Sequence, residues 1–450
     1  MISIRVSTIS NTWRARHRRP LILDSLICRR PCRCKPHSFI PSASPSKAPA
    51  QVDAEFTADF LQWLELKAGT EISSALSIGE STFGRSLFAQ THIKAGDCIL
   101  KVPYSVQVSS NNLPLRINSL LGDQVSNVAK VALLVLYEQK LGEKSEWAPY
   151  IRRLPQPAEM HNTIFWKDGE LEMIRPSPLY RETIRQKKIV ESDFLAITEA
   201  LCHFPKLHMV ITLDDFKYAY ALVTSRAWES FSGVSMVIAD RDYAPGAQVL
   251  IRYGKFSNAT LLLDFGFTLP YNTHDQVDVK LDLPLEDHLS SMKLELLSRH
   301  CTPTITDDLG FTSAENSFTL KEVRSAHGKG RGIPQSCRAY ARVLCSKSPQ
   351  EINDFAKEAA ENDGRLARGP LRDTCREIEA HQFLLLRITE LIYLYDASLE
   401  SLEQMTSLDT VNKNASRHQM AYDVLRGELR VLKSAAEWLE TYCKKLLNAS

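Results

Sequence analysis

The chain has 450 residues, a length that suits two or three domains. Hydrophobic residues make up 44% of it and charged residues 24%, which excludes a wholly disordered or collagen-like chain. No apolar run is long enough to cross a bilayer, so we expect no transmembrane helix.

Positive charge is concentrated in the first fifty residues. The whole chain has 55 basic and 53 acidic residues, and residues 1–50 contain ten of the basic residues but a single acidic residue, Asp24. The remainder therefore has 45 basic and 52 acidic residues, a net charge of −7. A body with this charge has no general attraction for polyanions, so we expect no nucleic-acid partner.

The basic leader is rich in serine and contains no apolar stretch of the kind found in secretory signals. Residues 1–50 are therefore predicted to be an organelle transit peptide. Chloroplast is the expected destination and mitochondrion the alternative. Two other interpretations of this segment stay open, namely a disordered basic tail and a misassigned start codon.

The ten cysteines predict neither a metal site nor a disulfide framework. Cys28, Cys32 and Cys34 lie in the leader, and the other seven show no CxxC spacing. No metal ligand is therefore assigned.

Hydrophobic periodicity predicts two kinds of structure along the chain. Up to about residue 280 the pattern is mixed. Residues 55–68, 127–141 and 216–228 read as helices, 86–108 as a hairpin or meander, and 235–238 and 248–253 as strands. From residue 285 onward the helical pattern dominates, with predicted helices at 287–300, 336–345, 350–362, 372–401 and 418–447. Within them, the dense apolar residues of 384–394 are interpreted as helix core.

Three segments, in order, resemble the SET-domain protein methyltransferases, and more narrowly the Rubisco large-subunit lysine methyltransferase group. The first is GRSLFA at 84–89, followed by IKAGD at 93–97 and Val102-Pro103. The second runs from Leu141-Gly142 to Leu154-Pro155 and includes Trp147 and PYI at 149–151. The third and most specific is YGKFSNA at 253–259, which continues into LLDFGF at 262–267.

The resemblance implies transfer of a methyl group from S-adenosylmethionine to a lysine of a protein substrate. In-line displacement requires an aligned amine without its proton, and burial together with a phenol hydrogen bond can provide one. Tyr253 matches the family's active-site tyrosine. Phe265 falls where relatives place a second aromatic residue, and it has no hydroxyl group, which would ease addition of more than one methyl.

The same resemblance assigns the other site residues. Cofactor contacts fall on Phe83, Gly84, Arg85, Arg226 and Phe265, with Gly84 allowing close approach of the main chain. Arg226 matches an arginine near the cofactor carboxylate, where a guanidinium can bind bidentately. Arg226 and Asn258 are assigned to the substrate side, and Asn258 is expected to brace the site.

One segment departs from the family pattern. Relatives carry an ADxxNH segment whose Asn and His contact the cofactor, whereas here Met236 passes directly to Val237, and the sequence contains no Asn-His dipeptide. Only 27 positions separate Arg226 from Tyr253. The join resembles a deletion near Met236 and predicts weak cofactor binding.

The predicted fold class is α+β. A strand-rich SET domain at 55–280, with a helical insertion at about 110–225, is followed by an all-α substrate-binding domain at 281–450. The predicted function is protein-lysine N-methylation, acting on an organellar protein such as Rubisco large subunit or aldolase. The alternatives are a catalytically impaired relative that binds a protein partner, and a histidine methyltransferase.

Overall fold

The computed structural model describes residues 2–4, 54–73, 75–81, 84–122, 124–202, 210–229, 234–251, 253–283, 286–300, 316–361, 364–366, 369–408 and 415–449. Apart from Ile2–Ile4, the predicted leader lies outside these ranges. The described chain forms two compact units. The first contains its residues up to Pro155 together with Ser192–Gly254, and the second contains Gln156–Glu191 and the chain from Lys255 onward. This division differs from the predicted boundary at residue 280, and part of the predicted insertion belongs to the second unit.

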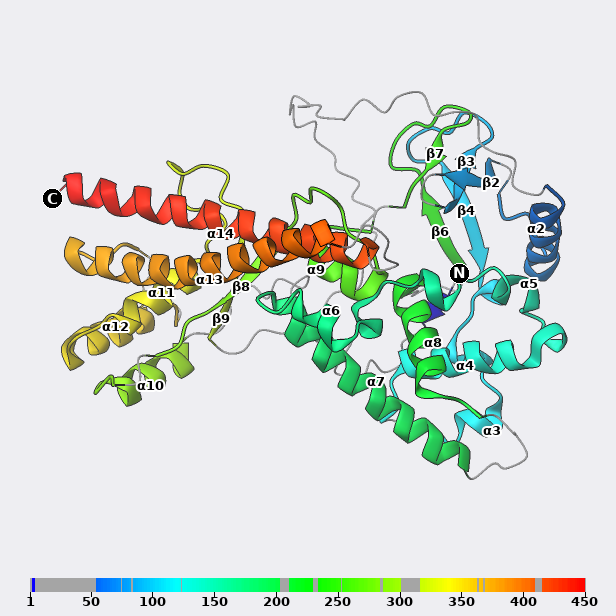
Figure 1. Ribbon diagram of the computed structural model, residues 1–450, viewed down its shortest axis with the longest axis horizontal. Helices are drawn as coiled ribbons and strands as arrows, with labels where there is room; N and C mark the ends of the chain where they lie inside the picture. Colours follow the sequence, from blue (N-terminus) through cyan, green and yellow to red (C-terminus); the bar gives the residue numbers. More distant parts are fainter. Residues whose placement is uncertain are drawn as a thin grey trace. The chain divides into compact units, whose positions relative to one another are not determined.

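The first unit combines short sheets with helices (Figure 1). Its elements are β1 (Ile2–Ile4), α2 (Ala54–Ala68), β2 (Leu76–Ser81), β3 (Gly84–Ala89), β4 (Cys98–Pro103), α3 (Leu115–Asn118), α4 (Asn127–Leu141), α5 (Ala148–Ile151), α8 (Leu213–Arg226), β5 (Ala227–Glu229), β6 (Val234–Ile238) and β7 (Gln248–Val249). The three-stranded antiparallel sheet of this unit has the order β2-β3-β7, while β4 pairs antiparallel with β6 and β1 pairs parallel with β5.

The prediction of a hairpin or meander over residues 86–108 is wrong in its strand pairing. The turn itself is present, since the Lys94 amide donates to Asp97 Oδ2 at 2.8 Å and the Asp97 amide donates to Lys94 O at 3.1 Å. However, β3 and β4 belong to different sheets, because β3 pairs with β2 and β7 while β4 pairs with β6. Partners distant in the sequence therefore decide how these strands pair.

The buried helix predicted at residues 127–141 is confirmed as α4. Its N-cap residue Ser126 accepts a hydrogen bond from the Ala129 amide at 3.1 Å, and the helix ends at Gly142, which has a φ of 55°. Both features are favourable helix ends. Residues from Val128 to Leu136 are largely buried, as expected for a helix that is apolar on most sides.

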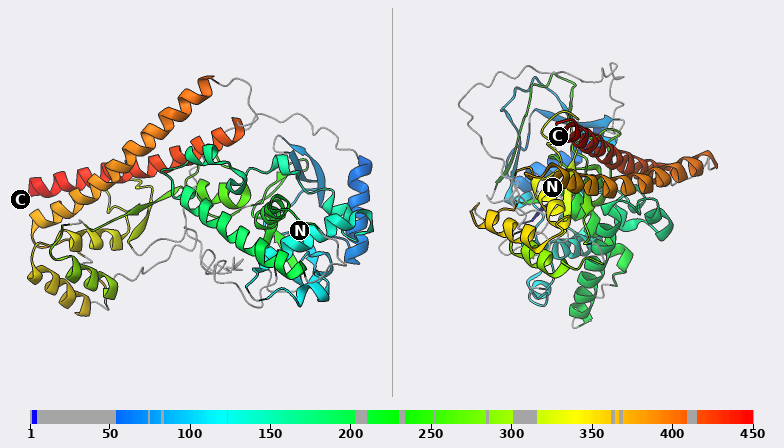
Figure 2. Two further views of the ribbon diagram at one scale, coloured as in Figure 1. Left: turned by 60° about the horizontal axis from the view of Figure 1, so that its bottom comes forward. Right: turned by 90° about the vertical axis from the view of Figure 1, so that its left-hand side faces the viewer.

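The second unit is mainly helical. The long helices α13 (Thr374–Leu408) and α14 (Ala415–Ala449) pack against each other and cross at an angle (Figure 2). Its elements are α6 (Asp168–Glu172), α9 (Asn258–Thr260), the π-helical turn η7 (Leu261–Phe265), β8 (Gln276–Lys280), α10 (Ser290–His300), β9 (Ser317–Lys321), α11 (Gln335–Leu344), α12 (Pro349–Glu361), α13 (Thr374–Leu408) and α14 (Ala415–Ala449). Helix α7 (Pro178–Cys202) contains the boundary between the two units. None of the described helices is both long and apolar enough to span a bilayer.

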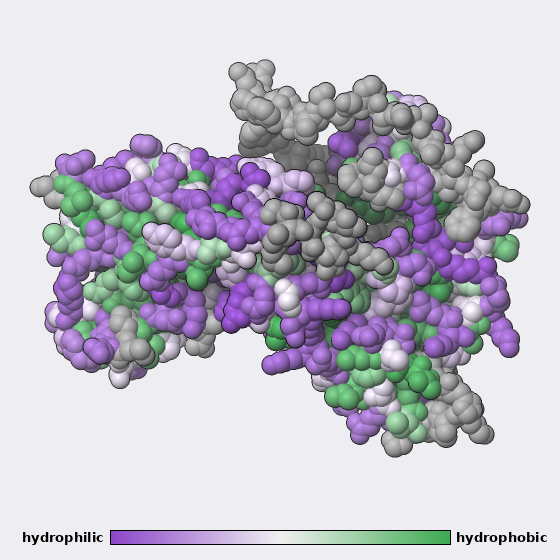
Figure 3. All heavy atoms as spheres, in the orientation of Figure 1, coloured by the Kyte–Doolittle hydropathy of each residue, from purple (hydrophilic) through white to green (hydrophobic). Residues whose placement is uncertain are grey.

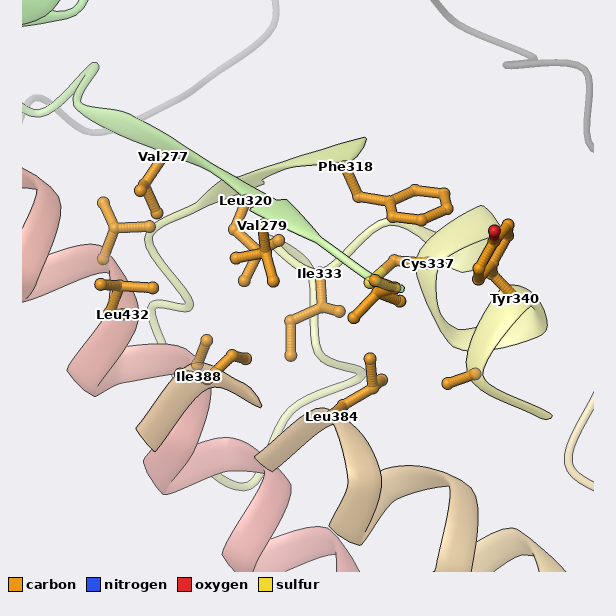
Figure 4. Packing of buried hydrophobic residues seen from close by; sticks show 14 of the residues in the cluster. Val277, Val279, Phe318, Leu320, Ile333, Cys337, Tyr340, Leu384, Ile388 and Leu432 are labelled. Atoms are coloured by element: carbon orange, nitrogen blue, oxygen red, sulfur yellow. The ribbon is translucent and has the colours of Figure 1, made fainter. Parts of the chain in front are cut away.

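The all-α prediction for residues 281–450 needs a correction. Strand β9 lies inside this region and pairs antiparallel with β8, with Val277 opposite Leu320 and Val279 opposite Phe318. Figure 4 shows these side chains packed toward Ile333 and the helical residues Leu384, Ile388 and Leu432. The two-stranded sheet of β8 and β9 therefore forms one wall of the core that the helices enclose.

The interpretation of residues 384–394 as helix core is only partly correct. Leu384 and Ile388 are buried, but Leu386 and Leu394 are 58% and 57% exposed on the outer face of α13. Figure 3 shows that hydrophilic residues dominate much of the visible surface, with separate hydrophobic patches between them. Helix α13 therefore carries more apolar side chains in this segment than its buried face accommodates.

A polar cluster lies within the core of the second unit. Glu428 on α14 accepts hydrogen bonds from Tyr395 Oη at 2.8 Å and Ser177 Oγ at 3.0 Å. It borders a polar cavity of about 10 Å³, which has room for one water molecule. Burial raises the pKa of Glu428 to about 8, and the nearby carboxylates Asp275 and Asp278 add to the rise.

This raised pKa gives a testable pH dependence of stability. Because the unfolded state releases the Glu428 proton near pH 4.5 and the folded state near pH 8, stability should fall as pH rises between these values, by up to about 1.4 kcal/mol per pH unit. Urea unfolding of the full chain at pH 5.5, 6.5 and 7.5 measures the slope. Burial also raises the pKa of Asp275 to about 6, so deprotonation of this carboxyl group adds to the fall in stability at pH values up to about 6. Glu428→Gln should flatten the slope between pH 6.5 and 7.5, and an unchanged slope would remove Glu428 from this role.

Candidate active site

Gly84 and Arg85 begin strand β3 in the first unit. Gly84 pairs with Ser81 of β2, and Phe83 lies outside the described residues. Arg85 Nη2 donates to the carbonyl oxygen of Arg153 at 2.8 Å, and Arg153 Nη1 donates to Pro149 O at 2.6 Å. Arg85 therefore ties β3 to the turn after α5, in addition to the cofactor contact predicted for it.

Arg226 is the last residue of α8 and is partly buried. Its Nη1 atom lies 2.5 Å from Ser225 Oγ. Burial raises the pKa of Tyr150 to about 12, and the positive charge of Arg226 opposes this rise. The guanidinium thus lies close enough to act on the Tyr150 phenol, in a setting where charge is weakly screened and a carboxylate could be bound.

Tyr253 follows strand β7 and is 42% exposed. Its neighbours Leu250 and Ile251 are also exposed. Tyr253 is therefore partly exposed and follows two exposed apolar residues.

Asn258 lies in the second unit and is 1% exposed. Its side-chain amide donates to Leu269 O and accepts from the Leu269 amide, both at 2.9 Å, and its own main-chain amide donates to Asp275 Oδ1 at 2.9 Å. These bonds fasten the start of α9 to the loop before β8. Both the bracing of the catalytic site by Asn258 and its direct contact with substrate stay predictions.

Phe265 ends η7 in the second unit and belongs to a row of aromatic rings. Its ring centroid lies 5.8 Å from that of Phe256 and 6.5 Å from that of Phe267. Within the first unit the structure describes Gly84, Arg85, Arg226 and Tyr253, and within the second Asn258 and Phe265. Each group is positioned by its own unit.

The join at Met236–Val237 falls in the middle of strand β6. Met236 pairs with Lys101 and Val237 with Leu100 of β4, so β6 is continuous through this point, although the register shifts beside it, between Cys98 and Leu100. Met236 is 54% and Ile238 41% exposed. A strand with two large apolar side chains on its outer face is one that a further segment of chain could cover.

The described residues contain no group of three or more His, Cys, Asp or Glu side chains arranged to hold a metal ion. The sequence did not predict the hydrogen bond from Arg85 to Arg153 or the electrostatic effect of Arg226 on Tyr150. Both link residues far apart in the chain, and no spacing in the sequence indicates them.

A known family model matches the C-terminal region of the chain. Residues 284–432 match the family model described as Rubisco LSMT substrate-binding. The chain has the fold of solved Rubisco LSMT structures, one of them bound to AdoMet, with a TM-score of 0.61, 21% identity, and coverage of 87% of this chain and 93% of the other. A SET-domain structure of LSMT bound to lysine and AdoHcy gives a TM-score of 0.62, 20% identity, and coverage of 88% and 93%.

Two kinds of curated relative also match. Actin-histidine N-methyltransferase of Gallus gallus is 22% identical over 448 residues, which cover 88% of this chain and 71% of the relative. The chloroplastic [fructose-bisphosphate aldolase]-lysine N-methyltransferase of Arabidopsis thaliana is 26% identical over 297 residues, which cover 56% of this chain and 60% of the relative. The resemblance to the Rubisco LSMT group predicted from the sequence is therefore confirmed.

Proposed function

We propose that the chain is an S-adenosylmethionine-dependent methyltransferase that modifies a lysine side chain of a protein substrate. The observation that carries this proposal is the match of residues 284–432 to the Rubisco LSMT substrate-binding family, in a chain with the fold of LSMT structures solved with AdoMet and with lysine. The aldolase-lysine methyltransferase relative supports the same acceptor.

The residues of the chain fit this chemistry in part. S-adenosylmethionine supplies a methyl group on a positively charged sulfur. Arg226 offers a partly buried guanidinium for a carboxylate, and the glycine at position 84 allows close approach of a ligand to the main chain. The Asn-His pair of relatives has no counterpart in the sequence. Tyr253 would orient the acceptor nitrogen through its hydroxyl group.

The hydroxyl group of Tyr253 can be tested directly. We expect Tyr253→Phe to lower kcat by about 100-fold or more, the scale of one positioned hydrogen-bonding or acid–base group, with little change in S-adenosylmethionine affinity. Tyr393→Phe removes a hydroxyl group from a tyrosine that is 71% exposed on α13 and serves as the control. Equal turnover in both variants would show that Tyr253 takes no part in methyl transfer.

Histidine is a second candidate acceptor, because the actin-histidine methyltransferases align with most of this chain. The two acceptors differ in their protonation. A lysine amine near pKa 10.4 must lose a proton, whereas an imidazole near pKa 6.5 is already neutral at pH 8. We expect kcat/KM to rise roughly tenfold per pH unit from pH 7 to 9 for lysine, and to stay nearly level above pH 7.5 for histidine. Mass spectrometry of the methylated peptide then identifies the residue.

A catalytically impaired chain that retains protein binding is the remaining alternative, favoured by the Met236–Val237 join. We also propose that residues 1–50 direct the protein to the chloroplast, with the mitochondrion as alternative. The ten-to-one excess of basic residues in this segment supports that targeting.

A further inference from the structure

The loop between β9 and α11 concentrates positive charge in the second unit. From residue 323 to residue 350 the sequence contains six lysine or arginine residues and no acidic residue. This composition contrasts with the 45 basic and 52 acidic residues of the chain beyond residue 50. The basic loop, residues 324–331, contains three of the six cations, namely Arg324, Lys329 and Arg331.

The three cations of the basic loop are exposed and have no carboxylate partner among the residues that the structure describes. Arg324, Lys329 and Arg331 are all exposed, and no described Asp or Glu oxygen lies within 4 Å of them. The acidic residue that precedes the loop, Glu322, instead lies with its Oε2 atom 3.5 Å from Arg430 Nε. The charge of the basic loop is therefore available to a partner.

The backbone of the basic loop is fixed against α14. Trp438 Nε1 donates to Gly328 O at 2.9 Å, and the Lys321 amide donates to Gly332 O at 2.9 Å at the base of the loop. Gly330 has a φ of 67° and lies so close to the Trp438 ring that an added Cβ atom would be 2.6 Å from it. A loop that is already ordered loses less conformational entropy when its cations bind a partner.

The residues of the loop favour an acidic polypeptide over a nucleic acid as that partner. Helix α14 adds another exposed cation, because Lys445 Nζ donates to His327 O at 3.5 Å. Residues 322–334 contain no Phe, Tyr or Trp on which a base could stack. Four cations are also fewer than the roughly 6–10 phosphate contacts of typical duplex-binding proteins. Carboxylates, by contrast, are bound singly, and an arginine can hold one bidentately.

We propose that the basic loop is a docking site for an acidic segment of the protein that this chain methylates, and that Arg324, Lys329 and Arg331 bind the Asp and Glu side chains of that segment. The identification of the partner as the methylated protein rests on the proposed function, because the loop lies within residues 284–432, which match the Rubisco LSMT substrate-binding family. Docking itself requires neither S-adenosylmethionine nor turnover, so binding alone tests it.

Two fluorescein-labelled peptides of about twelve residues test the charge of the partner. In one peptide Glu alternates with Ser, and in the other Gln replaces every Glu. We expect fluorescence anisotropy to show binding of the Glu peptide to the full chain at low ionic strength, and weaker binding as added salt screens the charges. The Gln peptide should not bind.

Paired charge reversals test the location. We expect Lys329→Glu together with Arg331→Glu to weaken binding of the Glu peptide by about tenfold or more, because two attractions become repulsions. Arg365→Glu together with Arg372→Glu makes the same change in net charge at two exposed arginines between α12 and α13, and should weaken binding by less than about twofold. Circular dichroism checks that each variant is folded.

Further arms separate docking from its alternatives. Lys329→Gln together with Arg331→Gln removes the attraction without adding repulsion and should weaken binding to an intermediate extent. The proposal is overturned if the Glu peptide does not bind at low salt, if the Gln pair has no effect, or if the two charge-reversed pairs weaken binding equally. Tighter binding of single-stranded DNA of equal charge would overturn it in favour of a nucleic-acid surface. Absence of methyl transfer with docking intact would count against the proposed function alone.

Discussion

Arg342→Ala should destabilise the second unit by about 3–5 kcal/mol, the effect of leaving one member of a buried ion pair alone. Arg342 on α11 and Glu377 on α13 are each 1% exposed in their side chains, and Arg342 donates to both carboxylate oxygens of Glu377 at 2.7 and 2.6 Å. Glu377 also accepts from Tyr442 Oη and from the Leu371 amide, both at 3.0 Å.

The charge on Glu377 is what makes the single substitution costly. Burial alone would raise the pKa of Glu377, but the hydrogen bonds from Arg342 and the Leu371 amide lower it below its usual value. The carboxylate thus stays ionised inside the core at neutral pH. Removal of Arg342 leaves that charge without its cation.

Urea unfolding followed by circular dichroism measures this effect. Arg387→Ala is the matched control, because Arg387 forms an exposed ion pair with Glu390 on α13 and should change stability by less than about 1 kcal/mol. The double replacement Arg342→Met with Glu377→Leu should recover most of the loss, since the uncompensated carboxylate is removed together with its cation. A loss in Arg342→Ala as small as that in Arg387→Ala would show that the pair is solvated.

The helices of the second unit were predictable because their apolar positions repeat over many turns. Predicted helices at 336–345 and 350–362 correspond to Gln335–Leu344 and Pro349–Glu361. The buried charges escaped the same reasoning, since Arg342 and Glu377 are 35 residues apart and no periodicity indicates that they meet. Strand β9 was missed although buried Phe318 and Leu320 alternate with more exposed neighbours, the pattern of a strand.

The candidate site shows a different limit of sequence reasoning. Motif positions such as Gly84, Arg226 and Tyr253 were assigned by resemblance, which names residues without giving their environment. Only the structure shows that the Asn258 amide is occupied by Leu269 and that Tyr253 is exposed. These properties depend on contacts with distant segments, and local sequence does not encode them.

S-adenosylmethionine should bind this chain about two to four decades more weakly than a version that carries the relatives' ADxxNH segment between Met236 and Val237. The family resemblance implies that two hydrogen bonds to a charged ligand are lost, each worth about 1.5–3 kcal/mol. Titration calorimetry on both proteins gives the ratio directly.

The structure explains why the inserted segment needs a matched control. Met236 and Val237 are paired with Lys101 and Leu100 in an uninterrupted strand, so any insertion divides β6. A Gly/Ser insertion of equal length causes the same division without the Asn and His, and it should not raise affinity. If the family segment does raise it, the added contacts and cover over Met236 and Ile238 are responsible, and not the longer connection. Low-micromolar binding by the unmodified chain would instead show that other residues have replaced the missing contacts, and the impaired alternative would then lose its main support.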